Sequence, residues 1–297
     1  MVADDFRSAY QWDIRPQHPS RPAWFREWPG GARIAVVVIV LNEWESNPWH
    51  RSRTMPTTYH HKFDFLALGG REYGVKHGIG RILDVLDSHG VKSTMVANGL
   101  VAELFPETVR AAKERGHEVA AHQWDQSVFS YMFNSRDEER AALVRTLDAL
   151  ESVTGERPLG YLSPGPRPTP CTLELLAGLD LRWTGDYVDS DLPCVLQVNG
   201  KRIVSVGYCT PGCSDFELLA HGAVQGLAEL KYTFDAVYEE SKQHPMKFCY
   251  AVHGNWGGTP GMARMFDGFL AYARGHEGVW FPRCIDVAEF WTAGSNA

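Results

Sequence analysis

Residues 33–41 read RIAVVVIVL, an almost unbroken run of apolar and mostly β-branched side chains. A strand of a parallel sheet is covered on both faces and shows such a run, whereas a strand with one face in water alternates apolar and polar residues. The run therefore predicts a parallel strand that is buried on both faces. It is far too short to cross a bilayer, which needs about 20 apolar residues in a helix.

Strand and helix patterns alternate along the rest of the chain. Short apolar runs predict further strands at 93–97, 117–121, 159–162, 183–184, 203–206 and 248–252. Apolar stripes with helical spacing predict helices at about 80–89, 106–116, 136–153 and 170–177. Such alternation specifies an α/β fold, a parallel sheet closed by helices into a (β/α) barrel.

The domain organisation is expected to be simple. We predict an N-terminal arm over residues 1–31, which is rich in Pro, Arg and Trp, and a single barrel domain over residues 32–297. Residues 42–71 form a long polar and aromatic loop without a clear periodic element. No internal repeat and no low-complexity linker divides the chain.

Composition limits the partners. Hydrophobic residues make up 44% and charged residues 22% of the chain, with a net charge of −7 and no run of like charges. This excludes a nucleic-acid or anionic-membrane surface, because both select for clustered Lys and Arg. The N-terminus shows no apolar signal segment, so a cytoplasmic enzyme with a small-molecule substrate is expected, and a homo-oligomer stays open. The six cysteines show no zinc-finger spacing and are expected to be reduced thiols.

Polar side chains follow several predicted strands directly. Glu43 and Glu45 follow the first strand, His122 follows the strand at 117–121, and His253 follows the strand at 248–252. In parallel barrels, reactive groups collect at the carboxyl ends of the strands. We therefore predict that His122, His253 and at least one of Glu43 and Glu45 meet in one pocket at the mouth of the barrel.

These residues resemble a known family. The strand-end carboxylates, GHEVAAH at 116–122, LSPG at 162–165 and the late strand ending in His253 look like the polysaccharide deacetylases, also called the chitooligosaccharide-deacetylase homology family. The resemblance extends from about residue 33 to residue 291. It implies a distorted (β/α)7 barrel and hydrolysis of carbon–nitrogen bonds other than peptide bonds.

Further motifs resemble the allantoinase-like branch of that family. They are REYG at 71–74, VGY at 206–208, Ser214-Asp215 and HEGVWF at 276–281. By this resemblance the expected substrate is a small cyclic amide, imide or ureide. An N-deacetylase of N-acetylated sugars or chitooligosaccharides is the alternative. From another class, an inactive metabolite- or sugar-binding barrel is motivated by the loss of standard residues, described next.

The metal motif departs from the standard family pattern. Standard members carry aspartates after the first strand and two metal-binding histidines four residues apart, whereas here His122 is followed four residues later by Gln126. Catalytic zinc usually takes three His, Asp or Glu ligands, and a neutral amide is a poor substitute. We therefore expect no firmly held metal. A weakly bound zinc ion stays open, through Glu45, His122 and Asp125 or with His253 opposite.

Without a metal, the hydrolysis needs a base, an acid and a group that polarises the carbonyl. Glu43 or Glu45 is the expected base, with a pKa raised by burial among aromatic residues. By resemblance His253 is the acid, and His122 polarises the carbonyl. The expected substrate-binding residues are Arg71, Glu72, Tyr73, Trp124, Asp186 and Asp215. Of these, Asp186 or Asp215 could also hold an imidazole in place.

Overall fold

The computed structural model describes residues 21–46 and 65–295. Its central strand is β1 (Ile34–Asn42), and every residue of β1 is buried. Val36 and Val38 pack with the helices on one face of the sheet, while Val37 and Ile39 pack on the other face with helix α11 (Cys284–Gly294). The predicted strand with two buried faces is therefore confirmed.

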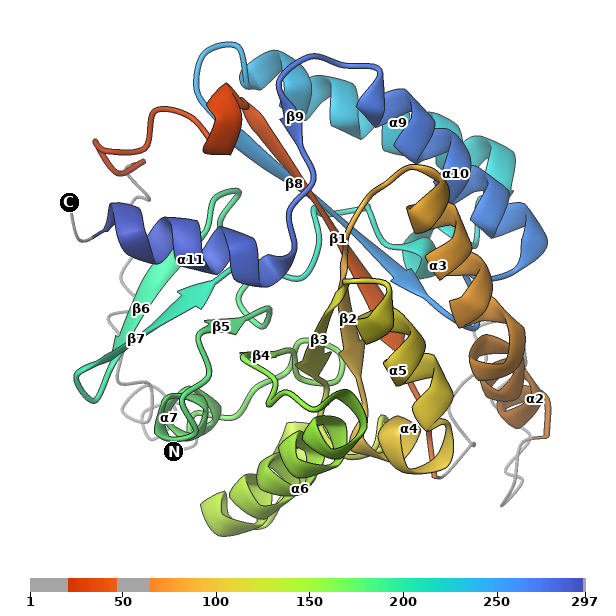
Figure 1. The fold of residues 1–297 in the computed structure, drawn as a ribbon, viewed down its shortest axis with the longest axis vertical. Helices are drawn as coiled ribbons and strands as arrows, with labels where there is room; N and C mark the ends of the chain where they lie inside the picture. Colours follow the sequence, from red (N-terminus) through yellow and green to blue (C-terminus); the bar gives the residue numbers. More distant parts are fainter. Residues whose placement is uncertain (1–20, 47–64, 296–297) are drawn as a thin grey trace, which may run out of the picture.

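The sheet is mainly parallel and curls into a partial barrel surrounded by helices (Figure 1). Along the sheet the strands run in the order β6-β7-β5-β4-β3-β2-β1-β8, and β9 pairs with the start of β1. Among the described strands, β6 and β7 form the antiparallel pair and the other pairs are parallel. Besides β1 they are β2 (Thr94–Ala97), β3 (Glu118–Ala121), β4 (Gly160–Tyr161), β5 (Trp183–Thr184), β6 (Cys194–Val198), β7 (Lys201–Ser205), β8 (Met246–His253) and β9 (Val279–Trp280).

Helices α3, α5, α6, α9 and α10 cover the outside of the strands, and α11 lies against β5, β6 and β7 (Figure 1). None of the described helices is both long and apolar enough to cross a membrane. Besides α11 the helices are α2 (Phe65–Tyr73), the π-helical turn η2 (Gly74–Gly78), α3 (Ile79–Ser88), α4 (Gly99–Leu104), α5 (Pro106–Glu114), α6 (Arg136–Thr154), α7 (Thr172–Gly178), α8 (Asp215–Leu218), α9 (Gly222–Glu240) and α10 (Pro260–Arg274).

The fold agrees with the predicted barrel class and differs at one point that matters for function. The segment at 65–73 is helix α2, not the end of a loop, and α2 continues through η2 into α3. Gly69 and Gly70 hide this helix in the sequence, because glycine is among the least favourable helix residues. Residues 47–64 of the predicted loop and residues 1–20 of the predicted arm lie outside the described residues. In the described part of the arm, Phe25 and Trp28 are buried against Trp291.

The N-terminal end of the barrel is closed by α11. The carboxylate of Glu118, on β3, accepts hydrogen bonds from Trp183 Nε1 at 2.7 Å and from the backbone N–H of Ile285 at 2.9 Å. Thr94 Oγ1 accepts one from the N–H of Cys284 at 2.7 Å. A carboxylate at a helix N-terminus satisfies N–H groups that have no partner within the helix. This packing leaves the carboxyl ends of the strands for a site.

Backbone contact between two segments positions α2. A β carbon on Gly78 would overlap the carbonyl group of Gly254, and one on Gly74 would lie 2.8 Å from the backbone nitrogen of Asn255. The η2 turn therefore lies directly on the loop that follows His253. Arg71 lies three residues before Gly74 on the same side of the helix, so its side chain is directed toward the same strand ends.

We expect Gly78→Ala to lower the free energy of unfolding by about 1–3 kcal/mol, because the added methyl group would push η2 off the loop after β8. Gly80 is the matched control, since an added β carbon there would have nothing within 4 Å. Gly80→Ala should be neutral or stabilise by up to about 1 kcal/mol. Urea unfolding of both variants tests this, and a Gly78→Ala protein as stable as the parent would contradict the close contact.

Candidate active site

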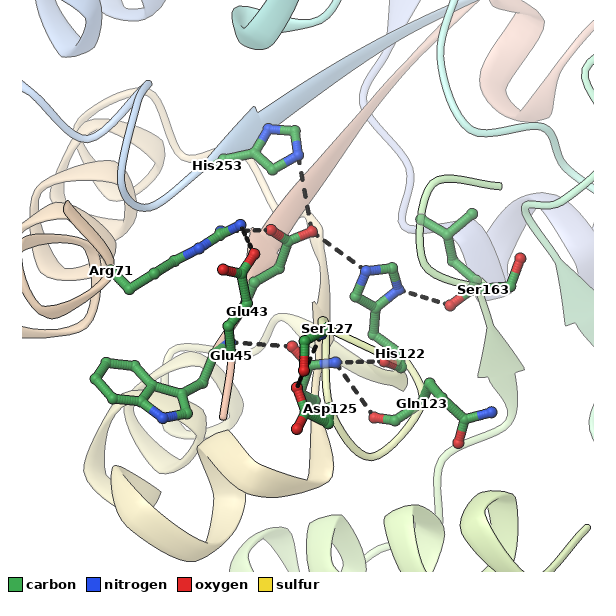
Figure 2. A network of polar contacts seen from close by, with 12 residues as sticks. Glu43, Glu45, Arg71, His122, Gln123, Asp125, Ser127, Ser163 and His253 are labelled. Carbon is green, nitrogen blue, oxygen red and sulfur yellow. Dashed lines mark hydrogen bonds and ion pairs between the residues drawn. The ribbon is translucent and has the colours of Figure 1, made fainter. Parts of the chain in front are cut away.

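Charged side chains from three strand ends and one helix meet at the mouth of the barrel (Figure 2). Glu43 directly follows β1, His122 directly follows β3, and His253 ends β8. His122 Nε2 lies 3.2 Å from Glu43 Oε1, and His253 Nε2 lies 3.8 Å from the same oxygen. The predicted convergence of these residues is confirmed.

Arg71 joins the cluster from α2 and binds both strand-end carboxylates (Figure 2). Its Nη1 lies 2.7 Å from Glu43 Oε2, and its Nη2 lies 2.5 Å from Glu45 Oε1. The Arg71 side chain is only 10% exposed, and both glutamates are buried more deeply. Buried carboxylates need such a partner, because an unpaired buried charge is costly. Arg71 is thus held by two glutamates, and its role in binding substrate stays a prediction.

Backbone and side-chain partners orient both imidazoles. His122 Nδ1 lies 2.6 Å from the carbonyl oxygen of Leu162, which can only accept, so Nδ1 carries a hydrogen. His253 Nδ1 lies 2.6 Å from Asp215 Oδ1, while Asp215 Oδ2 accepts from the N–H groups of His253 and Gly257, both at 2.7 Å. Asp215 therefore fixes the His253 ring. In both histidines Nε2 is left facing Glu43.

The charges in the cluster stabilise one another. Burial acts to raise the pKa of Glu43, but the positive charges of His253 and Arg71 and the hydrogen bond with His122 outweigh it and hold the pKa well below 4.5. Burial acts to lower the pKa of His253, but the carboxylates of Asp215 and Glu43 outweigh it and raise the pKa above 6.5. Our expectation that burial would raise the pKa of Glu43 is therefore wrong, because burial acts together with nearby cations.

Asp186 lies next to the cluster on the side of His122. Its Oδ1 accepts hydrogen bonds from the backbone N–H and the hydroxyl of Ser163, both at 2.7 Å. Burial raises the pKa of Asp186 to about 6, although the bonds from Ser163 and the charge of His122 oppose this shift. Its Oδ2 has no hydrogen-bond partner among the described residues. Asp186 thus offers one acceptor atom, Oδ2, that has no partner among the described residues. Its carboxyl group titrates near neutral pH.

Part of the chain matches a known family model. Residues 72–183 match the family model of polysaccharide deacetylase. The peptidoglycan deacetylase of Helicobacter pylori is 28% identical over 247 residues, which cover 71% of this chain and 83% of that protein. This chain therefore carries a polysaccharide deacetylase domain over residues 72–183 and resembles a deacetylase over most of its length. It is therefore a hydrolase of carbon–nitrogen bonds other than peptide bonds.

Solved structures of similar proteins share the whole fold. The crystal structure of PuuE allantoinase superposes with a TM-score of 0.83 at 26% identity, covering 96% of this chain and 98% of that one. A probable polysaccharide deacetylase from Pseudomonas aeruginosa superposes with a TM-score of 0.83 at 25% identity and the same coverage. The distorted barrel thus extends over nearly all of the chain.

Two residues of the REYG motif point away from the cluster. Glu72 forms an ion pair with Lys76 at 2.7 Å, and its side chain is 42% exposed. The Tyr73 hydroxyl accepts a hydrogen bond from Arg81 at 2.9 Å. Successive helical residues are rotated by about 100° around the helix axis. When Arg71 faces the strand ends, Glu72 and Tyr73 therefore face other directions. The expectation that Glu72 and Tyr73 bind substrate with Arg71 is corrected.

Trp124 is also turned away from the cluster. The guanidinium carbon of Arg145 lies 3.4 Å from the centre of its ring, and a β carbon on Gly99 would overlap that ring. The preceding residue, Gln123, has a φ of 57°, a left-handed conformation that turns the chain. The Trp124 ring therefore packs between α4 and α6, which corrects its predicted substrate-binding role.

Among residues 21–46 and 65–295, the side chains near the strand ends do not form a zinc site. Asp125 Oδ1 accepts hydrogen bonds from the backbone N–H groups of Ser127 at 2.8 Å and Ser46 at 3.2 Å, so Asp125 organises its own loop. Glu45 is bound by Arg71 instead of facing His122. In the described part of the chain, no group of three His, Cys, Asp or Glu side chains is placed to hold a metal. The trio of Glu45, His122 and Asp125 considered from the sequence is therefore not assembled.

Two aromatic residues lie close enough to influence the cluster, and sequence reasoning assigned them no role. The Trp256 ring lies 4.7 Å from the His253 ring, and the guanidinium carbon of Arg71 lies 5.6 Å from the Trp256 ring. The pKa of Tyr208 is raised well above 10 by burial and by nearby acidic groups that include Asp215, so its phenol stays protonated. In the sequence, Trp256 ends the motif HGNW at 253–256 and Tyr208 ends the motif VGY at 206–208, and these motifs could have identified them.

We expect Arg71→Met to lower the free energy of unfolding by roughly 3–5 kcal/mol at neutral pH, because Glu43 and Glu45 would be left buried without a cation. The deficit should shrink as the pH falls. In the parent, the lowered pKa of Glu43 stabilises the fold above the usual glutamate pKa of 4.5, and this contribution is lost in acid. Urea unfolding at about pH 7 and about pH 3.5 measures both effects, since the contribution of Glu43 is lost only below its usual pKa of 4.5.

The control for this prediction is Arg182→Met. Arg182 forms an ion pair with Glu289 at 3.0 Å in which both side chains are 57% exposed. Such a surface pair contributes less than about 1 kcal/mol. If Arg71→Met cost no more stability than Arg182→Met, the buried ion-pair network would not exist in solution.

Proposed function

We propose that this chain hydrolyses a ring carbon–nitrogen bond of a small cyclic amide, imide or ureide. The observation that carries the proposal is the bridge from Arg71 to Glu43 and Glu45, which gives the site a built-in cation in place of a cluster of metal ligands. The likeness to an allantoinase structure over 96% of the chain supports it. The deep burial of the cluster favours a small substrate over a polymer chain.

The chemistry of the leaving group favours the same substrates. In an imide or ureide, the departing nitrogen spreads its charge into a second carbonyl group, so it leaves more readily than the amine of an N-acetyl sugar. Hydrolysis of such a bond needs less electrophilic activation of the carbonyl. A site with fixed hydrogen-bond donors and a guanidinium matches that smaller demand.

In the proposed mechanism Glu43 is the base and His253 the acid. Arg71 holds Glu43 Oε2, which leaves Oε1 to take a proton from water while the water oxygen bonds to the carbonyl carbon. The carbon–nitrogen bond then breaks, and the nitrogen takes the proton of His253 Nε2. The products are a carboxylic acid and a free amide or ureido group. The proton returns from Glu43 to His253 across the 3.8 Å that separate Oε1 and Nε2.

The two proton transfers support each other. While His253 is charged it lowers the pKa of Glu43, which makes Glu43 a weak base. When His253 gives its proton to the leaving nitrogen, this cation disappears and Glu43 holds the proton from water more firmly. His122, anchored through Nδ1 on the Leu162 carbonyl, and the protonated phenol of Tyr208 are the proposed groups that polarise the substrate carbonyl.

We expect the parent to open allantoin, succinimide or a dihydropyrimidine at a rate that a chelator does not change. Glu43→Gln should reduce turnover by roughly a hundred- to ten-thousand-fold, because the general base is lost. Glu72→Gln is the control, since Glu72 is an exposed glutamate that forms an ion pair with Lys76. Product formation by each variant, with and without chelator, is the measurement.

The same screen includes oligomers of N-acetylglucosamine. Their deacetylation, without opening of any cyclic compound, would replace the proposal by the alternative N-deacetylase, which the likeness to a peptidoglycan deacetylase favours. Inactivity toward every compound would favour the inactive binding barrel. The cytoplasmic location, the small-molecule partner and the homo-oligomer remain predictions from the sequence.

We expect Asp215→Asn to move the basic limb of the kcat/KM profile to lower pH. Asp215 raises the pKa of His253, so its loss lets the catalytic proton leave at lower pH. The acid limb, set by Glu43, should move less. The raised pKa of His253 also stabilises the fold below about pH 6.5, a contribution lost as pH rises through the folded pKa, and Asp215→Asn should reduce it.

A surface pair offers the control. His89 Nε2 lies 2.7 Å from Asp267 Oδ1, and the Asp267 side chain is half-exposed. Asp267→Asn should leave the pH–rate profile unchanged. A basic limb that stays in place in Asp215→Asn would remove His253 from the role of acid.

A further inference from the structure

A pocket of about 270 Å³ lies apart from the catalytic cluster, between residues 188–191 and residues 207–211. None of the cluster residues lines it. Lys247, near the start of β8, contributes to its wall, six residues before His253 on the same strand. A strand advances about 3.3 Å per residue, so the two side chains are roughly 20 Å apart. The remaining polar lining comes from Asp189, Ser190, Asp191, Cys209 and Thr210.

Lys247 is a buried cation that the described structure leaves unpaired. The residue is only 6% exposed, and within the described ranges its ammonium group has neither a hydrogen bond nor an ion pair. Its Nζ atom is not among the fully buried side-chain atoms that lack a partner, so only the stem is enclosed and the ammonium group can pair with an anion in the pocket. The Nζ atom borders a pocket, so a ligand can reach it.

The side chains around Lys247 do not balance its charge. Burial raises the pKa of Cys194 and of Cys249 to about 11, although Lys247 itself opposes the shift, so both thiols are neutral near pH 7. Burial raises the pKa of Cys209 as well. The carboxylates of Asp189 and Asp191 lie on exposed residues and form no ion pair with Lys247 in the described structure.

A glycine keeps the ammonium group accessible. Gly207 has a φ of +81°, a conformation that other residues rarely adopt. A β carbon there would lie 3.4 Å from Nζ of Lys247 and 3.5 Å from the carbonyl oxygen of Tyr187. Any larger residue would thus place its side chain against the ammonium group.

We propose that this pocket binds a small carboxylate that also carries N–H donors, such as an amino acid or a ureido acid. The carboxylate pairs with Lys247, and the N–H donors are accepted by Asp189 and Asp191. The volume suits a compound of a few heavy atoms and excludes a sugar chain. Ring opening of a cyclic ureide would yield such an acid, but the pocket is inferred from its own residues and needs no turnover.

The test is calorimetric titration of the parent, Lys247→Met and the control Lys242→Met with N-carbamoylglycine, glycine, acetate and urea. Lys242 is a half-exposed lysine that pairs with Glu239 on the surface. The parent and Lys242→Met should bind N-carbamoylglycine or glycine, and Lys247→Met should bind at least about tenfold more weakly. Acetate should bind more weakly than the stronger of the two acids, and urea should not bind.

Further variants keep the outcome clear. The double variant Asp189→Asn with Asp191→Asn should weaken the binding of the acid that carries N–H donors. It should leave the binding of acetate unchanged. Without ligand, Lys247→Met should melt no lower than the parent, since the ammonium group makes no hydrogen bond or ion pair in the described structure and Met keeps the apolar stem. N-carbamoylglycine or glycine should raise the melting temperature of the parent but not that of Lys247→Met.

Three results would overturn the proposal. The first is that neither N-carbamoylglycine nor glycine binds to the parent, and the second is that they bind equally well to Lys247→Met. The third is that binding is lost in Glu43→Gln and retained in Lys247→Met, which would place the acid in the catalytic cluster. A Lys247→Met protein that melts far below the parent would assign the lysine a structural role instead. Because binding is measured without turnover, a failure of the proposed hydrolysis leaves these results interpretable.

Discussion

The guanidinium of Arg71 bonds to two buried carboxylates that belong to a different part of the chain, and the site depends on this bridge. Without it, Glu43 and Glu45 would be two like charges held close together away from water. With it, Glu43 keeps one oxygen bound to Arg71 and turns the other toward His122 and His253. The bridge therefore fixes the orientation of the proposed base, and together with His253 and His122 it keeps Glu43 ionised.

Backbone packing makes that bridge available. Gly74 and Gly78 let the η2 turn rest on the loop after β8, and this contact brings α2 close to the strand ends. At the opposite end of the barrel, Glu118 binds the N-terminus of α11 and closes the sheet. One end of the barrel thus stabilises the fold, and the other end presents the reactive groups. This arrangement is usual in parallel barrels.

The family resemblance and the local chemistry point to different details. The polysaccharide deacetylase domain at residues 72–183 and the likeness to a peptidoglycan deacetylase indicate a hydrolase of carbon–nitrogen bonds. The arrangement of Glu45, Arg71 and Asp125 does not supply the ligands that a zinc ion needs in such a hydrolase. A fixed cation from the protein can stabilise developing charge without a metal, but with less electrophilic power. This difference is the physical ground for expecting a substrate with a good leaving group.

The class of fold and the centre of the site could be predicted from the amino-acid sequence. The run at 33–41 could only be a strand buried on both faces, and Glu43, His122 and His253 follow strands whose ends meet in any parallel barrel. Only the tertiary structure decided that Arg71 turns inward, that its neighbours turn outward, and that the pKa of Glu43 is lowered. Helix orientation and electric fields depend on distances between residues far apart in the chain, and local patterns carry no information on those distances.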